Sequence, residues 1–174
     1  MTTRANQVEL AVASGEVSFD AKLEKKVGET IKRYPTARAA LLPVLWMCQE
    51  RYGWISHPVM AAVAQRLGES PAYVEGVVTF YTMFRTRPPA RFVLQVCRTL
   101  SCAVCGGKEL MAHLKERLGI DFGEQTADGM FELQAVECLG ACGSAPVVQI
   151  NDDYYEHQSP EQIDAVLENL RGKD

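Results

Sequence analysis

Five of the six cysteines in this chain gather in two short segments, and thiols spaced in this way can bind metals or exchange disulfides. The segment CRTLSCAVCGG supplies three of them, and ECLGACGSAP, further along the chain, supplies two. They are Cys97, Cys102, Cys105, Cys138 and Cys142. Because the N-terminal residues lack the apolar stretch of a secretory signal, we expect a cytosolic setting. Clustered cysteines there are more often metal ligands or redox-active groups than structural disulfides.

Two of the possible interpretations use only part of this set. In the first, Cys102 and Cys105 form a C-x-x-C dithiol between a strand and a helix, where the helix N-terminus would lower the pKa of a thiol. That interpretation leaves three cysteines without a role. In the second, Cys97, Cys102 and Cys105 with one distant cysteine match the plant-type C-x4-C-x2-C spacing of a 2Fe-2S cluster. That interpretation uses only one cysteine of the second segment.

The third interpretation, which the sequence favours, uses two pairs of cysteines on two neighbouring loops. Cys97 and Cys102 form one pair and Cys138 and Cys142 the other, so that four thiolates surround two irons. Adjacent glycines let the backbone approach the sulfur atoms and let free N–H groups donate to them. These glycines are Gly106, Gly107, Gly140 and Gly143. A zinc site stays open at this point, because spacings of C-x4-C and C-x3-C do not exclude it.

The C-terminal half predicts a small α/β layer that places both cysteine segments at the ends of strands. RFVLQVC reads as a strand that runs into the first segment, and MFELQAVEC as a strand that runs into the second. APVVQIND predicts a third strand and YYEHQ a possible fourth, while GKELMAHLKERLGI and SPEQIDAVLENL predict helices, the latter with a capping box. Open α/β sheets bind ligands at the carboxyl ends of their strands, which is where these cysteines fall.

The N-terminal half predicts four helices with recognisable end signals. Apolar residues recur at helical spacing from Phe19, and Pro43 either lies in the first turn of the second helix or kinks it. We expect Phe80, in the fourth helix, to belong to the core. The expected caps and stops are Ser18, Gly53, Ser56, Gly68 and Ser70.

The segment RTRPPA, at residues 85–90, is the clear linker, because its prolines and arginines interrupt every periodicity. We therefore expect a helical domain over residues 1–88, with a mobile polar tail over residues 1–17, and an α/β domain over residues 89–174.

Composition excludes several classes of function. The net charge of −4 and the lack of a basic run argue against a nucleic-acid partner. The longest apolar run, AALLPVLWM, is far shorter than the ~20 residues of a membrane span, so we expect no direct membrane insertion. No G-x-G-x-x-G follows a strand, so the chain itself has no evident NADH or flavin site.

The sequence resembles the thioredoxin-like 2Fe-2S subunit (the E-type subunit) of bacterial NADH:quinone oxidoreductase, respiratory complex I. The resemblance covers about residues 19–170 and rests on the pattern C-x4-C…C-x3-C, on ALLPVLWMCQERYGWI and VEGVVTFYTMF, and on the T-x-D-G-x-F of Thr126 to Phe131. It implies an N-terminal helical bundle and a C-terminal thioredoxin-like domain with one 2Fe-2S cluster. The ligands that it implies are Cys97, Cys102, Cys138 and Cys142, and it implies no catalytic residue in this chain.

The resemblance also implies a partner, a larger flavoprotein subunit with FMN and the NADH site, in the cytoplasmic peripheral arm of a membrane-bound complex. Similar subunits occur in soluble NAD-linked hydrogenases and formate dehydrogenases, which is the alternative setting. A thiol–disulfide oxidoreductase that uses Cys102 and Cys105 is a further alternative. The pattern does not call for a cysteine at position 105, and we expect Cys105 to be a spare buried thiol.

Overall fold

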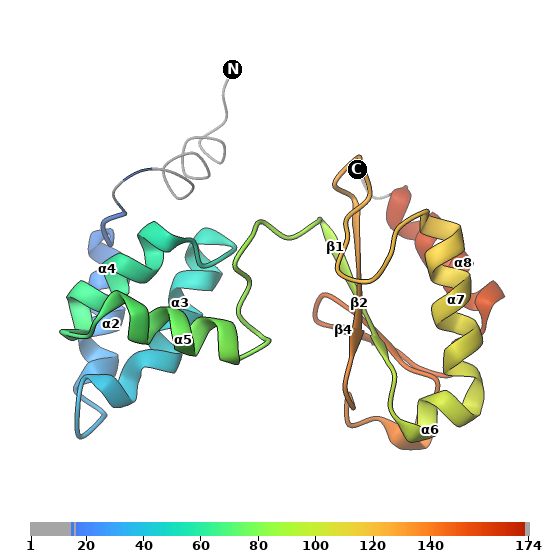
Figure 1. Ribbon diagram of the computed structural model, residues 1–174, viewed down its shortest axis with the longest axis horizontal. Helices are drawn as coiled ribbons and strands as arrows, with labels where there is room; N and C mark the ends of the chain where they lie inside the picture. Colours follow the sequence, from blue (N-terminus) through green and yellow to red (C-terminus); the bar gives the residue numbers. More distant parts are fainter. Residues whose placement is uncertain (1–14, 16, 173–174) are drawn as a thin grey trace. The chain divides into compact units, whose positions relative to one another are not determined.

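The computed structural model describes residue 15 and residues 17–172, and it divides the chain into two compact units, Met1–Pro88 and Pro89–Asp174 (Figure 1). The mobile tail expected over residues 1–17 lies almost entirely outside the described residues. None of the helices in the described part is long and apolar enough to cross a membrane.

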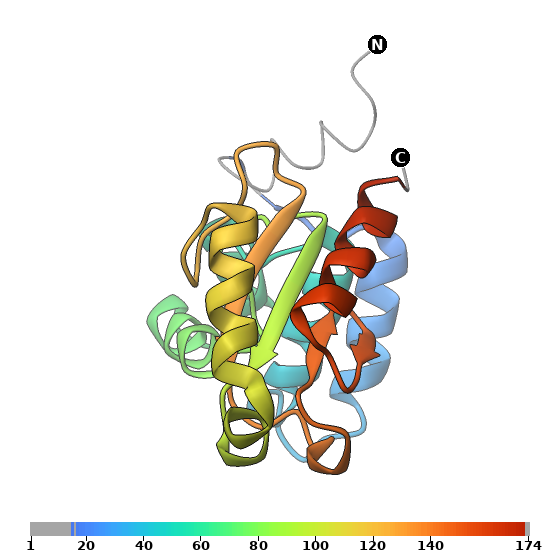
Figure 2. The same ribbon diagram turned by 90° about the vertical axis from the view of Figure 1, so that its right-hand side faces the viewer.

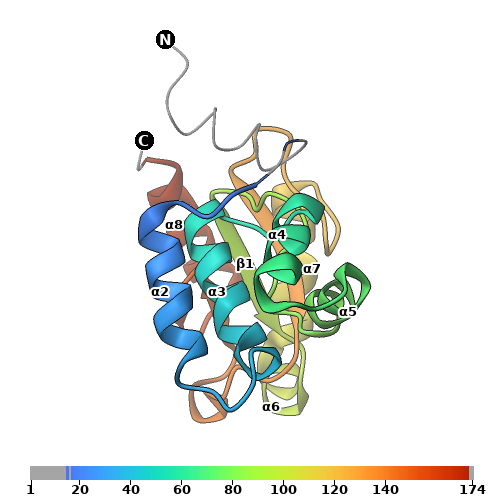
Figure 3. The same cartoon turned by 90° about the vertical axis from the view of Figure 1, so that its left-hand side faces the viewer.

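The first unit is built of α-helices. They are α2 (Ala21–Ile31), α3 (Leu41–Tyr52), α4 (His57–Leu67) and α5 (Pro71–Phe80), with a 3-10 turn (Arg38–Ala40) before α3. Helix α2 packs against α3, α3 against α4, and α4 against α5, and Figure 3 shows α2 and α3 side by side. Their apolar faces form one core, whose fully buried members include Val27, Val44, Leu45, Ile55, Val59 and Val63.

Local sequence signals set most of the helix ends in this unit. Ser56 and Ser70 cap α4 and α5 with their hydroxyls, as expected. Gly53 and Gly68 end α3 and α4 in the left-handed conformation, at φ of 84° and 70°. Pro43 lies in the first turn of α3, where its missing N–H costs no helical hydrogen bond.

Two expectations for this unit are wrong. The N-cap of α2 is Asp20 instead of Ser18, because the Asp20 carboxylate accepts from the Leu23 N–H at 2.8 Å and also pairs with Arg51 at 2.9 Å. Phe80 is 75% exposed, so it is no core residue. Helix α5 buries Val74 and Val78 instead, and Phe80 lies off that face at the last position of the helix.

The second unit is a four-stranded mixed sheet with the strand order β2-β1-β3-β4. The strands are β1 (Phe92–Cys97), β2 (Phe131–Val136), β3 (Val148–Ile150) and β4 (Asp153–Tyr155). Strands β1 and β2 are parallel, with Cys97 opposite Val136, whereas β1 and β3, and β3 and β4, are antiparallel. The expected strands, including the fourth, are therefore present.

Helices α7 (Lys108–Leu118) and α8 (Pro160–Arg171) cover one face of this sheet (Figures 1 and 2). The core between them contains Leu94, Leu110, Leu114, Phe131, Leu133, Ile163 and Leu167. Ser159 and Gln162 form the expected capping box of α8. The predicted architecture is confirmed: the N-terminal part is helical, and the C-terminal part is an α/β layer.

Candidate metal centre

The topology of the sheet brings the two cysteine segments to one edge. Strands β1 and β2 are parallel neighbours, so the loops that follow them leave from the same end of the sheet, at the foot of Figure 1. Cys97 is the last residue of β1, and Cys138 lies two residues beyond the end of β2. Arg98 connects the two loops through hydrogen bonds. Its backbone N–H donates to the Val136 carbonyl at 3.0 Å, and its guanidinium pairs with Glu137.

The first pair, Cys97 and Cys102, is buried, with exposed fractions of 3% and 2%. A helical turn, α6 (Leu100–Cys102), returns Cys102 toward the strand end, and a kinked turn (Ala103–Gly107) then leads into α7. The kink depends on Gly106, whose φ is 97°. Both thiols pack with Val147, which is also buried. The sequence patterns did not predict this extra turn before α7.

The second pair, Cys138 and Cys142, is exposed, and its two sulfur atoms lie 3.4 Å apart. Gly140 turns the loop between them at a φ of 81°, and its N–H donates to the Cys138 sulfur at 3.4 Å. A 3-10 turn (Cys142–Ser144) follows, and then a cis bond between Ala145 and Pro146. The expected donation from a glycine N–H to a sulfur atom is therefore present at one of the two loops.

The pKa values of the four thiols show that they interact. Burial raises the pKa of Cys102 to about 11, and its hydrogen bond with Cys97 adds to the rise. Burial opposes ionisation of Cys97 as well, but hydrogen bonds from Thr99 and Cys102 outweigh it and lower the Cys97 pKa. In the second pair, the Gly140 N–H and then the Cys142 thiol lower the pKa of Cys138.

Charge interactions also join the two pairs to each other. The hydrogen bond with Cys138, followed by its charge, raises the pKa of Cys142, and the charge of Cys97 contributes to the same rise. The Cys97 charge likewise opposes ionisation of Cys138. Each of these thiolates therefore opposes the ionisation of its neighbours. A bound metal cation removes this repulsion, because it takes the place of the thiol protons.

Two other cysteines lie outside this set. Cys105 is exposed, so the expectation of a spare buried thiol is wrong. It follows Cys102 by three residues, but its backbone has left the helical conformation, at φ −89° and ψ 21°. Cys48 lies in the core of the first unit, as its position on an apolar helix face indicates, and burial raises its pKa to about 12.

Thr99 is a residue of the site that the sequence patterns did not single out. Its hydroxyl oxygen lies 3.2 Å from the Cys97 sulfur. The sequence signal that could have identified Thr99 is its position, a hydroxyl residue two places after a candidate ligand.

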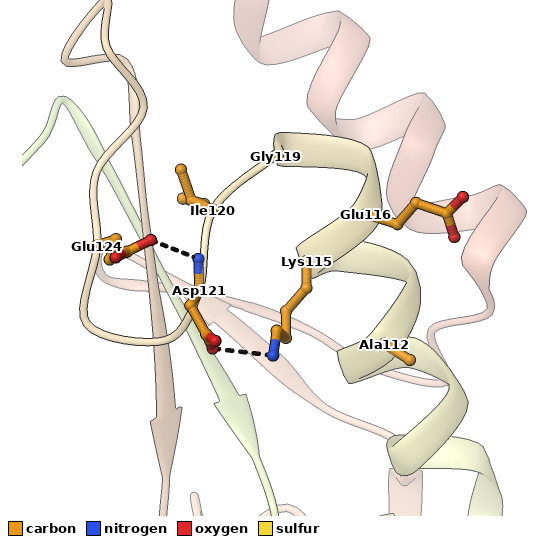
Figure 4. A pocket seen from close by; sticks show the side chains of 7 residues that line it. All are labelled: Ala112, Lys115, Glu116, Gly119, Ile120, Asp121 and Glu124. Carbon is orange, nitrogen blue, oxygen red and sulfur yellow. Dashed lines mark hydrogen bonds and ion pairs between the residues drawn. The ribbon is translucent and has the colours of Figure 1, made fainter.

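A surface hollow of about 500 Å³ lies elsewhere on this unit, at the C-terminal end of α7. Figure 4 shows its lining: Lys115 pairs with Asp121 at 2.9 Å, and the Asp121 N–H donates to the Glu124 carboxylate at 2.7 Å. The hollow is open, and three of its polar residues, Lys115, Asp121 and Glu124, are linked to one another by these contacts. The cysteines lie beyond the opposite end of α7, so this hollow is no part of the candidate centre.

The donor set fits a cluster of two irons. Four thiols in two pairs from two adjacent loops match the four cysteines that a 2Fe-2S cluster requires. Within the described residues, no three or more His, Cys, Asp or Glu side chains are grouped closely enough to hold a metal ion, so the fit rests on the number and the pairing of the thiols. A backbone N–H donates to the Cys138 sulfur and a hydroxyl lies in hydrogen-bond contact with the Cys97 sulfur, as is usual around thiolate-bound clusters.

Comparison with known proteins identifies the class. The family model of the thioredoxin-like [2Fe-2S] ferredoxins matches residues 27–171. The subunit designated E 2 in the NADH-quinone oxidoreductase of Rhizobium meliloti is 44% identical to this chain over 149 residues, which is 86% of this chain and 89% of that protein. NADH-quinone oxidoreductase subunit 2 of Thermus thermophilus is 43% identical over 146 residues, or 82% of this chain and 81% of that protein.

A solved structure resembles this fold over a comparable length. The crystal structure of an NAD+-reducing [NiFe]-hydrogenase in the H2-reduced state superimposes with a TM-score of 0.69 at 24% identity. The match covers 78% of this chain and 22% of the hydrogenase chain.

The fold and the thiol-lined edge thus define a thioredoxin-like 2Fe-2S protein, and its cofactor is one 2Fe-2S cluster. Within that class, the chain belongs to the family of the E-type subunits of NADH-quinone oxidoreductase, which are components of an oxidoreductase complex. The resemblance stated from the sequence motifs is confirmed.

Proposed function

We propose that this chain is an electron-transfer subunit whose 2Fe-2S cluster is held by Cys97, Cys102, Cys138 and Cys142. The observation that carries the proposal is the meeting of two thiol pairs at one edge of the sheet, one pair buried and one exposed. The cluster supplies one-electron oxidation and reduction when it is bound. The chain itself supplies the ligands, the N–H and hydroxyl donors at the sulfur atoms, and the scaffold that fixes the two loops.

The difference in exposure between the pairs suggests a direction for electron transfer. Cys97 and Cys102 are packed against Val147 and anchor the cluster to the domain. Cys138 and Cys142 are exposed on the outer side. A redox partner would therefore approach over the second loop, whose two thiols are the exposed pair.

We also propose the partner and the setting. The relatives are named as subunits of NADH-quinone oxidoreductase, so the chain would join a flavoprotein subunit that carries FMN and the NADH site. NADH oxidation would take place on that partner, in the cytoplasmic peripheral arm of the complex. The alternative is an NAD-linked hydrogenase or formate dehydrogenase, and of these two the hydrogenase has the support of a fold likeness alone. Co-purification of the tagged chain from its own cells, with identification of the bound subunits, distinguishes the two settings.

The cluster and its ligands can be tested directly by electron paramagnetic resonance (EPR). Protein purified without oxygen and reduced with dithionite is expected to give a spin-half signal with an average g below 2, at about one spin per chain. Cys142→Ser is expected to abolish or alter this signal. An unchanged signal in that variant would contradict the ligand set, and zinc without iron in the wild type would contradict the function.

Cys105 provides the matched control for the cysteine variants. It lies three residues from Cys102 and is exposed, and we propose that it is no ligand. Cys105→Ser is expected to keep the full signal. If the chain instead reduces insulin disulfides without iron, and Cys105→Ser abolishes that activity, the dithiol interpretation replaces this one.

We propose finally that the two units, 1–88 and 89–174, are separate domains joined by the linker at residues 85–90. A chain of residues 89–174 is then expected to fold and to bind the cluster by itself. Failure to acquire iron, while the full chain acquires it, would contradict the domain assignment.

A further inference from the structure

The hydroxyl of Thr99 has an unusual position for a residue at the start of a helix. Thr99 is the N-cap of α6, and its carbonyl accepts from the Ala103 N–H at 2.9 Å. A threonine at this position normally turns its hydroxyl onto the N–H groups of the first turn. Here the side chain makes no capping hydrogen bond. The Thr99 hydroxyl lies instead 3.2 Å from the Cys97 sulfur.

The contact joins a side chain that is no ligand to a candidate ligand. Cys97 is only 3% exposed, so the Thr99 hydroxyl lies against a sulfur atom that is shielded from water. A metal-bound cysteine has lost its proton, so the hydroxyl is then the donor of this hydrogen bond. On the second loop, the Gly140 N–H donates to the Cys138 sulfur at 3.4 Å.

A donor in this place has a defined effect on a thiolate-bound cluster. Reduction adds one electron, and the extra negative charge spreads onto the ligand sulfur atoms. Hydrogen bonds to those atoms stabilise the reduced form more than the oxidised form, so they raise the reduction potential. A hydroxyl has one hydrogen to donate, so its effect is that of one charge-assisted hydrogen bond.

We propose that Thr99 is a positioning residue of the 2Fe-2S centre, whose hydroxyl donates to the Cys97 sulfur and raises the reduction potential of the cluster. The proposal rests on the ligand set given under the proposed function and goes beyond it. It assigns a role in electron transfer to Thr99, which is no ligand: its hydroxyl helps to set the reduction potential of the cluster.

The test uses three variants of the full chain and a redox titration followed by EPR. Thr99→Val removes the hydroxyl and keeps the shape of the side chain, whereas Thr99→Ser keeps the hydroxyl. Thr79→Val is the matched control, because the Thr79 hydroxyl donates to the Glu75 carbonyl at 2.9 Å in the first unit. Iron and sulfide content is measured on every sample, so that the readout does not depend on activity.

Thr99→Val is expected to shift the one-electron equilibrium roughly tenfold against the reduced form, a fall of about 59 mV in the midpoint potential. Thr99→Ser and Thr79→Val are expected to keep the wild-type potential. If Thr99→Val does not retain the cluster, retention of both cluster and potential by Thr99→Ser supports the role of the hydroxyl. Loss in both variants overturns it, and so does a Thr99→Val variant with a full cluster and the wild-type potential.

Failure of this proposal can be told apart from failure of the proposed function. If the wild type has no spin-half signal, or Cys142→Ser leaves it unchanged, the function or the ligand set is wrong. If these two experiments give the expected results and Thr99→Val keeps the wild-type potential, only the role of Thr99 is wrong.

Discussion

Gly107 gives the sharpest structural prediction for the site, because it touches the backbone of a candidate ligand. A methyl group added at Gly107 would lie 2.6 Å from the Cys102 carbonyl oxygen and 2.8 Å from the Cys102 carbonyl carbon. Ordinary contact begins at 3.4 Å, so the Gly107→Ala variant must move these atoms apart by about 0.8 Å. The obstacle is backbone and not a flexible side chain, so the displacement falls on Cys102 itself.

Two energies oppose each other in this variant. Gly107 has helical dihedrals, φ −62° and ψ −28°, so alanine would gain up to about 1 kcal/mol from helix propensity. Overpacking against a fixed backbone costs about 1–3 kcal/mol. We expect a net loss of up to about 2 kcal/mol in the free energy of unfolding. The effect on the cluster should be larger, because ligand positions tolerate a displacement of only about 0.5 Å.

The control is Gly143→Ala on the other cysteine loop. A methyl group there meets no atom within 4 Å, and no left-handed φ requires glycine at that position. Iron and sulfide per chain, the EPR spin count and a urea unfolding curve are measured for both variants. We expect Gly107→Ala to lose most of its cluster and Gly143→Ala to keep it. Equal cluster content in the two variants would refute the reasoning.

Three further predictions concern the helical unit. Leu45→Ala should cost about 2–5 kcal/mol of unfolding free energy and Phe80→Ser less than about 0.5, because Leu45 is fully buried and Phe80 is 75% exposed; equal costs in urea unfolding would place Phe80 in the core. Ser56→Ala should cost about 1 kcal/mol of unfolding free energy, because the α4 cap is lost. An unchanged midpoint of urea unfolding would show that the cap does not stabilise the unit. The Leu23 N–H and then Arg51 lower the pKa of Asp20 below 3.8, so the stability from its charge is present above that pH and is lost as the pH falls through the lowered value. The wild type and Asp20→Asn should therefore differ in stability at pH 6 and converge in acid, and a difference that does not change with pH would contradict this.

The sequence predicts best those features that depend on a few adjacent residues. The stops at Gly53 and Gly68 need a left-handed backbone, which glycine adopts without strain. The capping box of α8 is likewise contained within four residues. The misplaced cap of α2 has a different origin. Asp20 directly precedes the first helical residue and caps the Leu23 N–H, and it also pairs with Arg51 on another helix, a contact that local patterns do not reveal.

The choice among the cysteines depends on contacts that spacing cannot show. Cys102 and Cys105 are three residues apart, which on a regular helix would put both thiols on one face. The kink at Gly106 ends that regularity, so that Cys102 is buried beside Cys97 while Cys105 is exposed. The parallel pairing of β1 with β2 then brings in the second loop. Spacing supplied the candidates, and the topology of the sheet decides which of them meet.

Thr99 illustrates why local sequence rules can fail to identify a functional residue. Such rules assign its hydroxyl to the cap of the helix that it starts. In the structure the Thr99 hydroxyl makes no capping hydrogen bond and lies against the Cys97 sulfur instead. Departures from local rules concentrate at functional sites, where another interaction compensates for the loss. An N-cap threonine that does not cap its helix, two residues after a candidate ligand, is for this reason where we expect the protein to adjust the reduction potential of its cluster.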